Sequence, residues 1–472
     1  MNTVKASTVT PQEFIDSGGL KARHWLVFGV IALVLMADGM DITIVSHVFP
    51  SLVKEWGATG TQITFIVTVS FIGMGLGAII GGRMADRFGR KILTVLSLIL
   101  LGVTTIAMAT APNMEMFIFW RIVSSLGLGG VMPVIMTLLA DLVPSANRGQ
   151  LVAIVSAGIG LGTTFGAFLA GAVIPDSGWR TLMTICGIIP LALIIPFLAL
   201  VPESPAWLAA RGSMGRARRA LEKLVPGSLP STVQLVAPAV AQKNKGAFKT
   251  ILSRRFVAVT GLIWAYAFIG LGVQMTIVQY LPTLLQAPVP GLTTAQSSLV
   301  VGLYGAGSMV GNILLGMLLR KYSRFGVVGT FLVLSIGSLV IIGSNPSMEF
   351  PLLVLMMSLT GLVLPTILGG TQNIFATIEY PARVRATGVG SASLAGRVGS
   401  VAGGITGGTL LGAGLGFSGF FLVLALPVAV MVGVVGAMSA TKRHHSAIGI
   451  SDSAGENPQV RSDSSADHTV PQ

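Results

Sequence analysis

The chain carries little charge and almost no cysteine. Only 10% of its 472 residues are Asp, Glu, Lys or Arg, whereas a soluble domain usually has about 25%. The single cysteine, Cys186, has no partner in the chain, which excludes a disulfide framework. The sequence also lacks a metal-ligand cluster, a nucleophile triad and a phosphate-binding loop. We therefore expect no catalytic residue, no metal and no cofactor, and we predict that the protein is not an enzyme.

In place of charge the chain has long apolar stretches. Hydrophobic residues make up 52% of it, and the mean hydropathy is +0.82. About 20 apolar residues in a helix cross a bilayer, and the 60 glycines allow such helices to pack closely. The predicted fold class is an all-α integral membrane protein. Its twelve transmembrane helices are expected at residues 25–47, 62–82, 92–111, 116–139, 151–173, 181–201, 256–281, 298–318, 326–343, 351–375, 387–411 and 416–438.

The basic residues lie mostly on one side of these helices. If the N-terminus is cytoplasmic, all but four of the 30 lysines and arginines fall in cytoplasmic segments. Two of the four, Lys54 and Arg180, lie outside, and Arg121 and Arg397 lie within helices. This asymmetry follows the positive-inside rule. It predicts a multi-pass protein of the inner (plasma) membrane with both termini in the cytoplasm, and it explains the net charge of +13 without nucleic acid. Membrane lipids are the expected partners of the basic central loop.

The helices form two groups of six that repeat. Segment 316–324 repeats the glycine and two basic positions of 82–91, and Pro50 returns as Pro282. Duplicated six-helix units are the architecture of transporters that rock around a central site, so we predict two pseudo-symmetric six-helix bundles. The expected division is a cytoplasmic N-terminal tail (1–24), an N-terminal bundle (25–201), a cytoplasmic central loop (202–255), a C-terminal bundle (256–438) and a cytoplasmic, disordered tail (439–472).

Segment 82–91 carries a family resemblance. It reads Gly-Arg-Met-Ala-Asp-Arg-Phe-Gly-Arg-Lys and resembles the signature between helices 2 and 3 of the major facilitator superfamily. The resemblance, with the repeat, covers nearly the whole chain. It implies a cytoplasmic gate held by hydrogen-bonded charges; the alternative is a basic loop that only sets topology. The implied gate residues are Gly82, Asp86, Arg87, Gly89, Arg90 and Lys91, with helix-end motifs at Asp141, Arg148, Glu379 and Arg385.

The run Asp38-Gly39-Met40-Asp41 resembles the Asp-Gly-x-Asp motif of the aromatic acid:proton symporters within that superfamily. Segments 280–285, 385–390 and 396–399 are also similar to that family. The resemblance implies import of a hydroxybenzoate-like aromatic carboxylate with protons, by alternating access. Gln279-Tyr280 stands where the family commonly has Asn-Trp, and Gly404 where proline is common, which leaves the identity of the acid open. The implied substrate contacts are Arg397, Arg121, Gln279, Tyr280, Gln372 and Asn373.

Four charged residues lie clearly inside the predicted spans: Asp38, Asp41, Arg121 and Arg397. An ionised carboxylate at bilayer depth costs roughly 2.5–3.5 kcal/mol on insertion scales, so such residues usually mark an ion or substrate path. Asp38 and Asp41 share a helix face, and we expect them to couple transport to protons. The alternatives are that Asp41 and Arg121, at similar depth, form a structural pair, and that Asp38 bonds groups of the fourth helix.

Arg397 is the residue expected to bind the substrate carboxylate. Its planar guanidinium suits two parallel hydrogen bonds to a carboxylate, and no acid inside the spans of the second half offers it a partner. Arg121 has a similar claim, but the aspartates compete for it. The alternative for Arg397 is bonding to helix-end carbonyls or to Gln372 and Asn373.

Other functions remain open at this point. A carrier of the same superfamily for sugars, another organic acid or drugs is the main alternative; the glycine–proline motif that drug exporters usually show in helix 5 is absent. A membrane sensor without transport is a further alternative. Small residues recur every three or four positions at 158–170 and 396–407, and we interpret both stripes as packing across the two halves. We expect a monomer, with the number of protons undecided.

Overall fold

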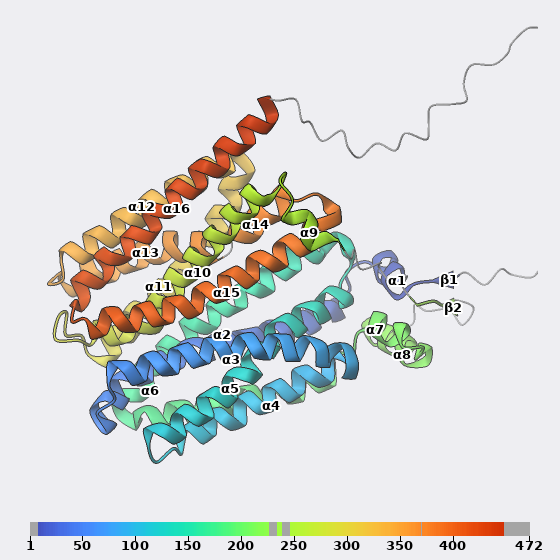
Figure 1. Cartoon of the computed structure of the whole chain (residues 1–472). Helices are drawn as coiled ribbons and strands as arrows, with labels where there is room; N and C mark the ends of the chain where they lie inside the picture. The colour runs from blue at the N-terminus through green and yellow to red at the C-terminus, as the bar shows by residue number, and fades with distance from the viewer. Residues whose placement is uncertain (1–7, 226–233, 238–245, 370, 448–472) are drawn as a thin grey trace, which may run out of the picture.

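The structure is a computed structural model that describes residues 8–225, 234–237, 246–369 and 371–447. Long helices run side by side through the molecule, and the short elements gather at one end (Figure 1). We call this the terminal end. The other end, which carries the connections at 57–59, 110–113 and 286–293, is the opposite end.

The first half consists of long helices that begin and end at recognisable caps. Gly57, with a φ of 62°, ends α2, and Thr59 with Gln62 forms a capping box that starts α3. Gly178, with a φ of 78°, breaks α6 into two successive helices, so the predicted fifth and sixth spans follow each other without a long loop. The helices are α2 (Ala22–Trp56), α3 (Gly60–Phe88), α4 (Arg90–Ala109), α5 (Met114–Leu142) and α6 (Ser145–Leu200).

The second half repeats this plan. Thr293 and Gln296 form a capping box at the start of α11, at the positions that correspond to Thr59 and Gln62 in the first half. The tenth predicted span is divided between α13 and α14. The helices are α10 (Val257–Leu285), α11 (Thr294–Lys321), α12 (Arg324–Ser344), α13 (Phe350–Gly369), α14 (Thr371–Glu379), α15 (Ala382–Gly412) and α16 (Gly416–Ala447).

These helices agree with twelve membrane crossings. Within the described ranges, ten helices are long and apolar enough to span a bilayer. One of the ten is α6, which holds two helices, and α15 is a further long helix that is not among them. Large apolar side chains also point outward along single faces, as Ile72, Leu76 and Ile79 do on α3. Such exposed apolar surface requires a non-aqueous environment.

The two stripes of small residues pack within the halves and not across them, so this prediction was wrong. Gly158 and Gly162 of α6 lie against the backbone of α2, and Gly399 and Gly403 of α15 lie against that of α10. In each case a Cβ atom would collide with the neighbouring helix. The stripes were assigned to the wrong interface because spacing reveals a close approach without revealing which helix approaches.

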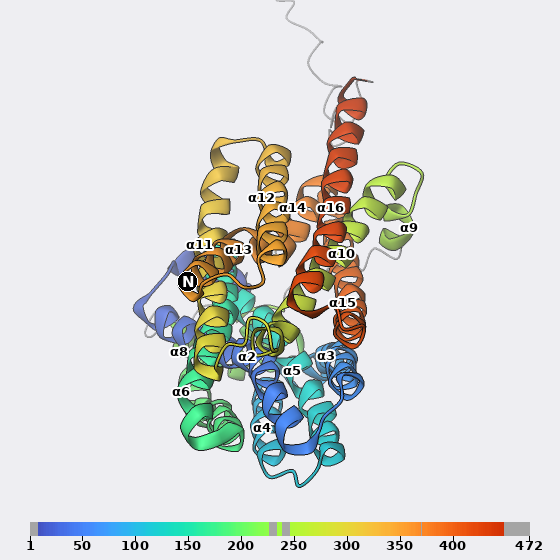
Figure 2. The same cartoon turned by 90° about the vertical axis from the view of Figure 1, so that its left-hand side faces the viewer.

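The halves join through α2 with α10, α3 with α15, and α6 with α11. Seen from the opposite end, the first half lies below the second (Figure 2). Gly408 of α15 packs on Thr64 of α3, and Gly302 of α11 packs on Phe168 of α6. Both contacts lie between mid-depth and the opposite end, so the halves are closed against each other there.

The terminal end holds folded elements where the sequence predicted a plain tail and loop. These are β1 (Thr8–Val9), α1 (Pro11–Gly18), α7 (Pro205–Ala210), α8 (Met214–Leu224), β2 (Gln234–Leu235) and α9 (Ala247–Ile251). Strand β1 pairs in parallel with β2, and Phe14 and Ile15 of α1 join the hydrophobic cluster that contains Leu221 and Leu224 of α8. In the predicted C-terminal tail, α16 continues to Ala447; residues 448–472 lie outside the described residues.

Helix α1 is also held by polar contacts. The backbone N–H and the hydroxyl of Ser145 donate to the carboxylate of Asp16 at 2.7 and 2.8 Å. Burial alone would raise the pKa of Asp16, but the hydrogen bonds from Ser145 and Gln12 outweigh burial and lower it. The N-terminal segment is thereby fastened to the start of α6.

Candidate functional site

Asp41 and Arg121 form a buried ion pair at mid-depth in the first half. The Arg121 Nη1 donates to Asp41 Oδ2 at 2.8 Å, and its Nε donates to the Ser70 hydroxyl at 3.0 Å. The Thr105 hydroxyl donates to the other carboxylate oxygen of Asp41 at 3.2 Å. Asp41 is 3% exposed and Arg121 2%. Helices α2, α3, α4 and α5 therefore meet around one hydrogen-bonded charge pair, and Asp41 and Arg121, which the sequence placed at similar depth, form the pair that it left open as an alternative.

Asp38 lies one helical turn before Asp41 in a different setting. It is equally buried, but its Oδ1 has no hydrogen-bond partner. It interacts electrostatically with Asp41 and with Arg397. Gly39 beside it packs directly on the backbone of Ile159 in α6, which fixes this turn of α2 against its neighbour. A buried carboxylate oxygen without a donor is costly and suggests a group whose partner changes.

Arg397 of α15 is half-buried and faces the same region from the second half. Its electrostatic partner is Asp38 of α2. The sequence offered no acid partner for Arg397 within the spans of the second half. The acid that interacts with it, Asp38, belongs to the first half. Asp38, Asp41, Arg121 and Arg397 thus form one group of four charges, which we call the central cluster.

The remaining predicted substrate contacts divide into two sets. Gln279 Nε2 donates across the halves to the Ile42 carbonyl at 3.0 Å, one residue after Asp41. Tyr280 is fully buried, and its hydroxyl donates to the Gly404 carbonyl of α15 at 2.7 Å. The side chains of Gln372 and Asn373 lie outside the described residues.

Sequence reasoning missed two polar residues that bond the central cluster and one that contacts His47 further along α2. Ser70 and Thr105 complete the bonding of Arg121 and Asp41. Ser298 lies 3.3 Å from Nδ1 of His47 and joins α11 to α2. A serine or threonine in an apolar helix was the available signal, but many such residues bond only their own backbone. Within the described part of the chain, no group of three His, Cys, Asp or Glu side chains could hold a metal.

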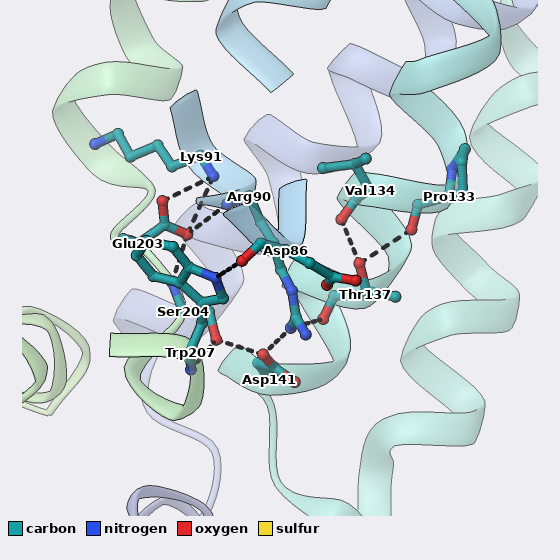
Figure 3. A network of polar contacts seen from close by, with 10 residues as sticks. All are labelled: Asp86, Arg90, Lys91, Pro133, Val134, Thr137, Asp141, Glu203, Ser204 and Trp207. Atoms are coloured by element: carbon teal, nitrogen blue, oxygen red, sulfur yellow. Dashed lines mark hydrogen bonds and ion pairs between the residues drawn. The ribbon is translucent and has the colours of Figure 1, made fainter. Parts of the chain in front are cut away.

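A second polar network lies at the terminal end of the first half (Figure 3). Arg90, at the start of α4, pairs with Asp141 near the end of α5, and the Ser204 hydroxyl donates to the same carboxylate. Arg90 also donates to the Thr137 carbonyl at 3.2 Å. We call these residues, together with Glu203, the terminal network. Its members come from α4, α5 and the segment after α6, so it ties three parts of the first half together.

Glu203 occupies the end of α4 within this network. Its carboxylate accepts the backbone N–H groups of Arg90 and Lys91 at 3.0 and 3.1 Å, which satisfies donors at a helix N-terminus. Gly89 has a φ of 108°, and a Cβ there would collide with the Glu203 carboxylate. Only glycine meets both conditions, so the signature glycine and Glu203 depend on each other.

The other predicted gate residues have smaller parts. The backbone carbonyl of Asp86, and not its carboxylate, accepts from Trp207 Nε1 at 2.9 Å and from Arg211 at 3.2 Å. Arg87 lies exposed over the ring of Phe88, and Lys91 donates to the Leu198 carbonyl at 2.7 Å. A Cβ atom at Gly82 would meet no described atom outside its own turn within 4 Å, so no close contact requires glycine there.

The second half has a simpler counterpart. Arg324, at the start of α12, pairs with Glu379 of α14 at 2.6 Å. Arg385 donates to the Tyr380 carbonyl at 3.4 Å. In the first half, Arg148 has a buried Nε without a partner and interacts electrostatically with Asp16. The helix-end pairs therefore recur in both halves, but no acid in the second half takes the place of Glu203 among the described residues.

Most of the chain matches one known protein family. The sequence pattern described as the Major Facilitator Superfamily matches residues 31–404. The chain belongs to this superfamily. It is a multi-pass membrane transporter and not an enzyme, as the sequence predicted.

Several transporters are similar in sequence to this protein over most of its length. It is 30% identical to the gallate transporter of Pseudomonas putida over 420 residues, which cover 88% of this chain and 92% of the relative. It is 29% identical to the 4-hydroxybenzoate transporter PcaK of Acinetobacter baylyi over 433 residues, covering 90% and 93%. The solved structure titled the inward open conformation of the xylose transporter XylE from E. coli matches with a TM-score of 0.67 at 16% identity, covering 88% and 99%. That likeness shows the fold alone.

Proposed function

We propose that this transporter imports an aromatic carboxylate together with protons, by alternating access between its two halves. The observation that carries the proposal is the central cluster, in which two acids and two arginines from α2, α5 and α15 meet at mid-depth. Charges at that depth are retained for a transported ion or substrate. Relatives named as transporters of gallate and 4-hydroxybenzoate, both aromatic carboxylates, support this substrate class.

In this proposal Arg397 binds the substrate carboxylate, and the aspartate pair handles protons. Arg397 suits the role because its guanidinium can form two parallel hydrogen bonds with a carboxylate. Arg121 is the weaker candidate, since Asp41 and Ser70 already occupy its donors. Gln279 remains a proposed substrate contact, and its hydrogen bond to the α2 backbone next to Asp41 supports this. Tyr280, Gln372 and Asn373 remain proposed contacts.

The proposed setting is the inner membrane of a cell, with both termini in the cytoplasm. The basic loops support this orientation, which makes the terminal end cytoplasmic and the opposite end external. The contacts between the halves near the opposite end then correspond to a state closed to the outside. The terminal network and its counterpart, Arg324 with Glu379, would hold or release the cytoplasmic side. We propose the two six-helix bundles, 25–201 and 256–438, as the moving bodies.

Uptake by purified protein in liposomes tests this function. We expect labelled 4-hydroxybenzoate or gallate to accumulate when the interior is made more alkaline than the exterior, and an uncoupler to abolish the accumulation. Unlabelled aromatic acids should compete, and sugars or lipophilic cations should not. Accumulation that survives collapse of the pH gradient, or competition by sugars alone, would contradict the proposal.

A further inference from the structure

The two aspartates of the central cluster differ in a way that bears on which one carries the proton. Both oxygens of Asp41 accept hydrogen bonds, one from Arg121 at 2.8 Å and one from Thr105 at 3.2 Å. These donors favour the ionised carboxylate, and protonation would displace one of them. Both oxygens of Asp41 are therefore already occupied by donors.

Asp38 lacks this support. Its Oδ1 is buried without any donor, although the residue is as inaccessible as Asp41. A buried anion with an unsatisfied oxygen is expensive, whereas the neutral acid in the same place is far less so. Asp38 is therefore the member of the pair that is stable in this packing when it holds a proton.

Among the described residues, the favourable charge near Asp38 comes from Arg397 across the interface of the halves. Among the described residues, the half-buried Arg397 guanidinium has Asp38 as its charged partner and donates no hydrogen bond; the side chains of Gln372 and Asn373 are not among these residues. A substrate carboxylate and the ionised Asp38 would therefore compete for the same guanidinium. When the substrate carboxylate binds Arg397, the ionised form of Asp38 loses its stabilising counter-charge.

Other charged groups around Asp38 do not disturb this relation. Helix α2 contributes Asp41, α5 contributes Arg121, and α15 contributes Arg397. Helices α6 and α10 both contact α2, and their residues 151–173 and 257–285 contain no Asp, Glu, Lys, Arg or His. His47, the next titratable group on α2, lies nine positions further along and contacts Ser298.

Resting on the proposed function, we infer that Asp38, and not Asp41, binds the single proton that accompanies each aromatic carboxylate. The substrate carboxylate binds Arg397 in place of Asp38. Asp38 then takes up a proton from the outer solution, which forms an O–H bond on its carboxylate. On the cytoplasmic side that bond breaks, the proton passes to water, and the substrate leaves Arg397. Asp38 then regains Arg397 as its counter-charge.

Charge balance supports one proton for each monoanion. In the empty carrier Asp41 balances Arg121, and Asp38 balances Arg397. In the loaded carrier Asp41 still balances Arg121, the substrate balances Arg397, and Asp38 is neutral. The central cluster has no net charge in either state, which avoids moving an uncompensated charge through the bilayer. A second proton would leave it positively charged.

The test compares Asp38→Asn with Asp41→Asn in liposomes. We expect D38N to lose pH-driven accumulation of 4-hydroxybenzoate at least tenfold while exchange of labelled for unlabelled substrate persists. The matched control D41N breaks the pair with Arg121, so both exchange and accumulation should fall. Accumulation by D38N at the wild-type level would overturn the inference, and so would a D41N variant that exchanges substrate but no longer accumulates it.

A measurement on the unmodified protein covers the case in which D38N does not fold. With the pH gradient fixed, accumulation should be the same at zero potential and at 100 mV inside-negative. A second proton would raise accumulation roughly fifty-fold under that potential and would overturn the inference. If the unmodified protein shows no pH-driven uptake of any aromatic acid, the proposed function itself fails, and the two failures are therefore distinct.

Discussion

The first half of the molecule holds a hydrogen-bonded ion pair in the central cluster, whereas the central arginine of the second half finds its acid across the interface between the halves. Asp41 and Arg121 bond each other and their neighbours Thr105 and Ser70. Arg397 has no such partner in its own half and depends on Asp38. In the proposed mechanism the bonded pair is the fixed part of the central cluster, and Arg397 is the residue that exchanges one anion for another.

The repeat explains how this difference is maintained. Asp38 and Asp41 correspond in the second half to Gly270 and Val273. A Cβ at Gly270 would lie 2.9 Å from the Leu368 carbonyl, so α10 packs too closely on α13 there to admit an acid. The two halves therefore share capping boxes and helix order. They differ at these two positions, where the first half has acids and the second half has residues that carry no charge.

The largest effect is expected from breaking the ion pair between Asp41 and Arg121. Asp41→Ala leaves Arg121 buried without its counter-ion, and removal of one partner from a buried pair costs about 3–5 kcal/mol. We expect a large fall in the thermal unfolding temperature in detergent. Removing both charges in Asp41→Asn with Arg121→Met should recover part of the loss. A single variant as stable as the unmodified protein would show that the pair is not a structural frame.

The next largest effect is expected from Arg397, the central charge of the second half. Arg397→Ala should weaken binding of 4-hydroxybenzoate by a factor of about 30 or more, because a desolvated charged contact is worth roughly 2–5 kcal/mol. Arg397→Lys retains the charge without the paired donors and should recover binding only partly. Calorimetric titration of the purified protein measures both, with the exposed Arg320→Ala as the control. Unchanged affinity in Arg397→Ala would transfer the substrate site to Arg121.

A smaller effect separates the terminal ends of the two halves. Glu203→Gln removes the charge from hydrogen bonds to three backbone groups, those of Arg90, Lys91 and Ser204, each worth about 1.5–3 kcal/mol. Glu379→Gln weakens one partly buried pair with Arg324, worth about 1 kcal/mol. We expect Glu203→Gln to change the transport rate more than Glu379→Gln does. Equal effects would indicate that the two ends act alike despite their different contacts.

The smallest effect concerns helix α1. The pKa of Asp16 is lowered in the folded protein, so its stabilising contribution is present above its ordinary pKa of 3.8 and is lost as the pH falls through the folded value. Asp16→Asn should weaken this docking at neutral pH and remove its acid dependence. Limited proteolysis should cleave the N-terminal segment slightly faster in the variant. Equal cleavage from neutral pH to pH 3 in the unmodified protein would contradict the role of Asp16.

Much of the fold could be predicted because apolar length is a local property. The twelve spans and the repeat follow from stretches of about 20 residues and from motifs such as 82–91. The proximity of Asp41 and Arg121 could also be predicted, since depth along a helix follows from residue count. Helix partners could not be predicted, and the glycine stripes were accordingly assigned to the wrong interface.

The site was less predictable because its contacts join distant segments. Glu203 caps α4 across more than a hundred residues, and no local pattern identifies its partner. The contact between Asp38 and Arg397 depends on how the two halves close against each other. The different bonding of Asp38 and Asp41 was also invisible, because both are acids on one helix face and only the packing of Thr105 and Arg121 distinguishes them.

The most direct test of the central claim is the proton movement that accompanies substrate. Liposomes containing the protein are suspended in weakly buffered medium, and a pH-sensitive dye follows the exterior after 4-hydroxybenzoate is added. The account predicts alkalinisation of the exterior in proportion to substrate taken up, with one proton for each carboxylate, and none with D38N. Substrate uptake without any proton movement in the unmodified protein would contradict it.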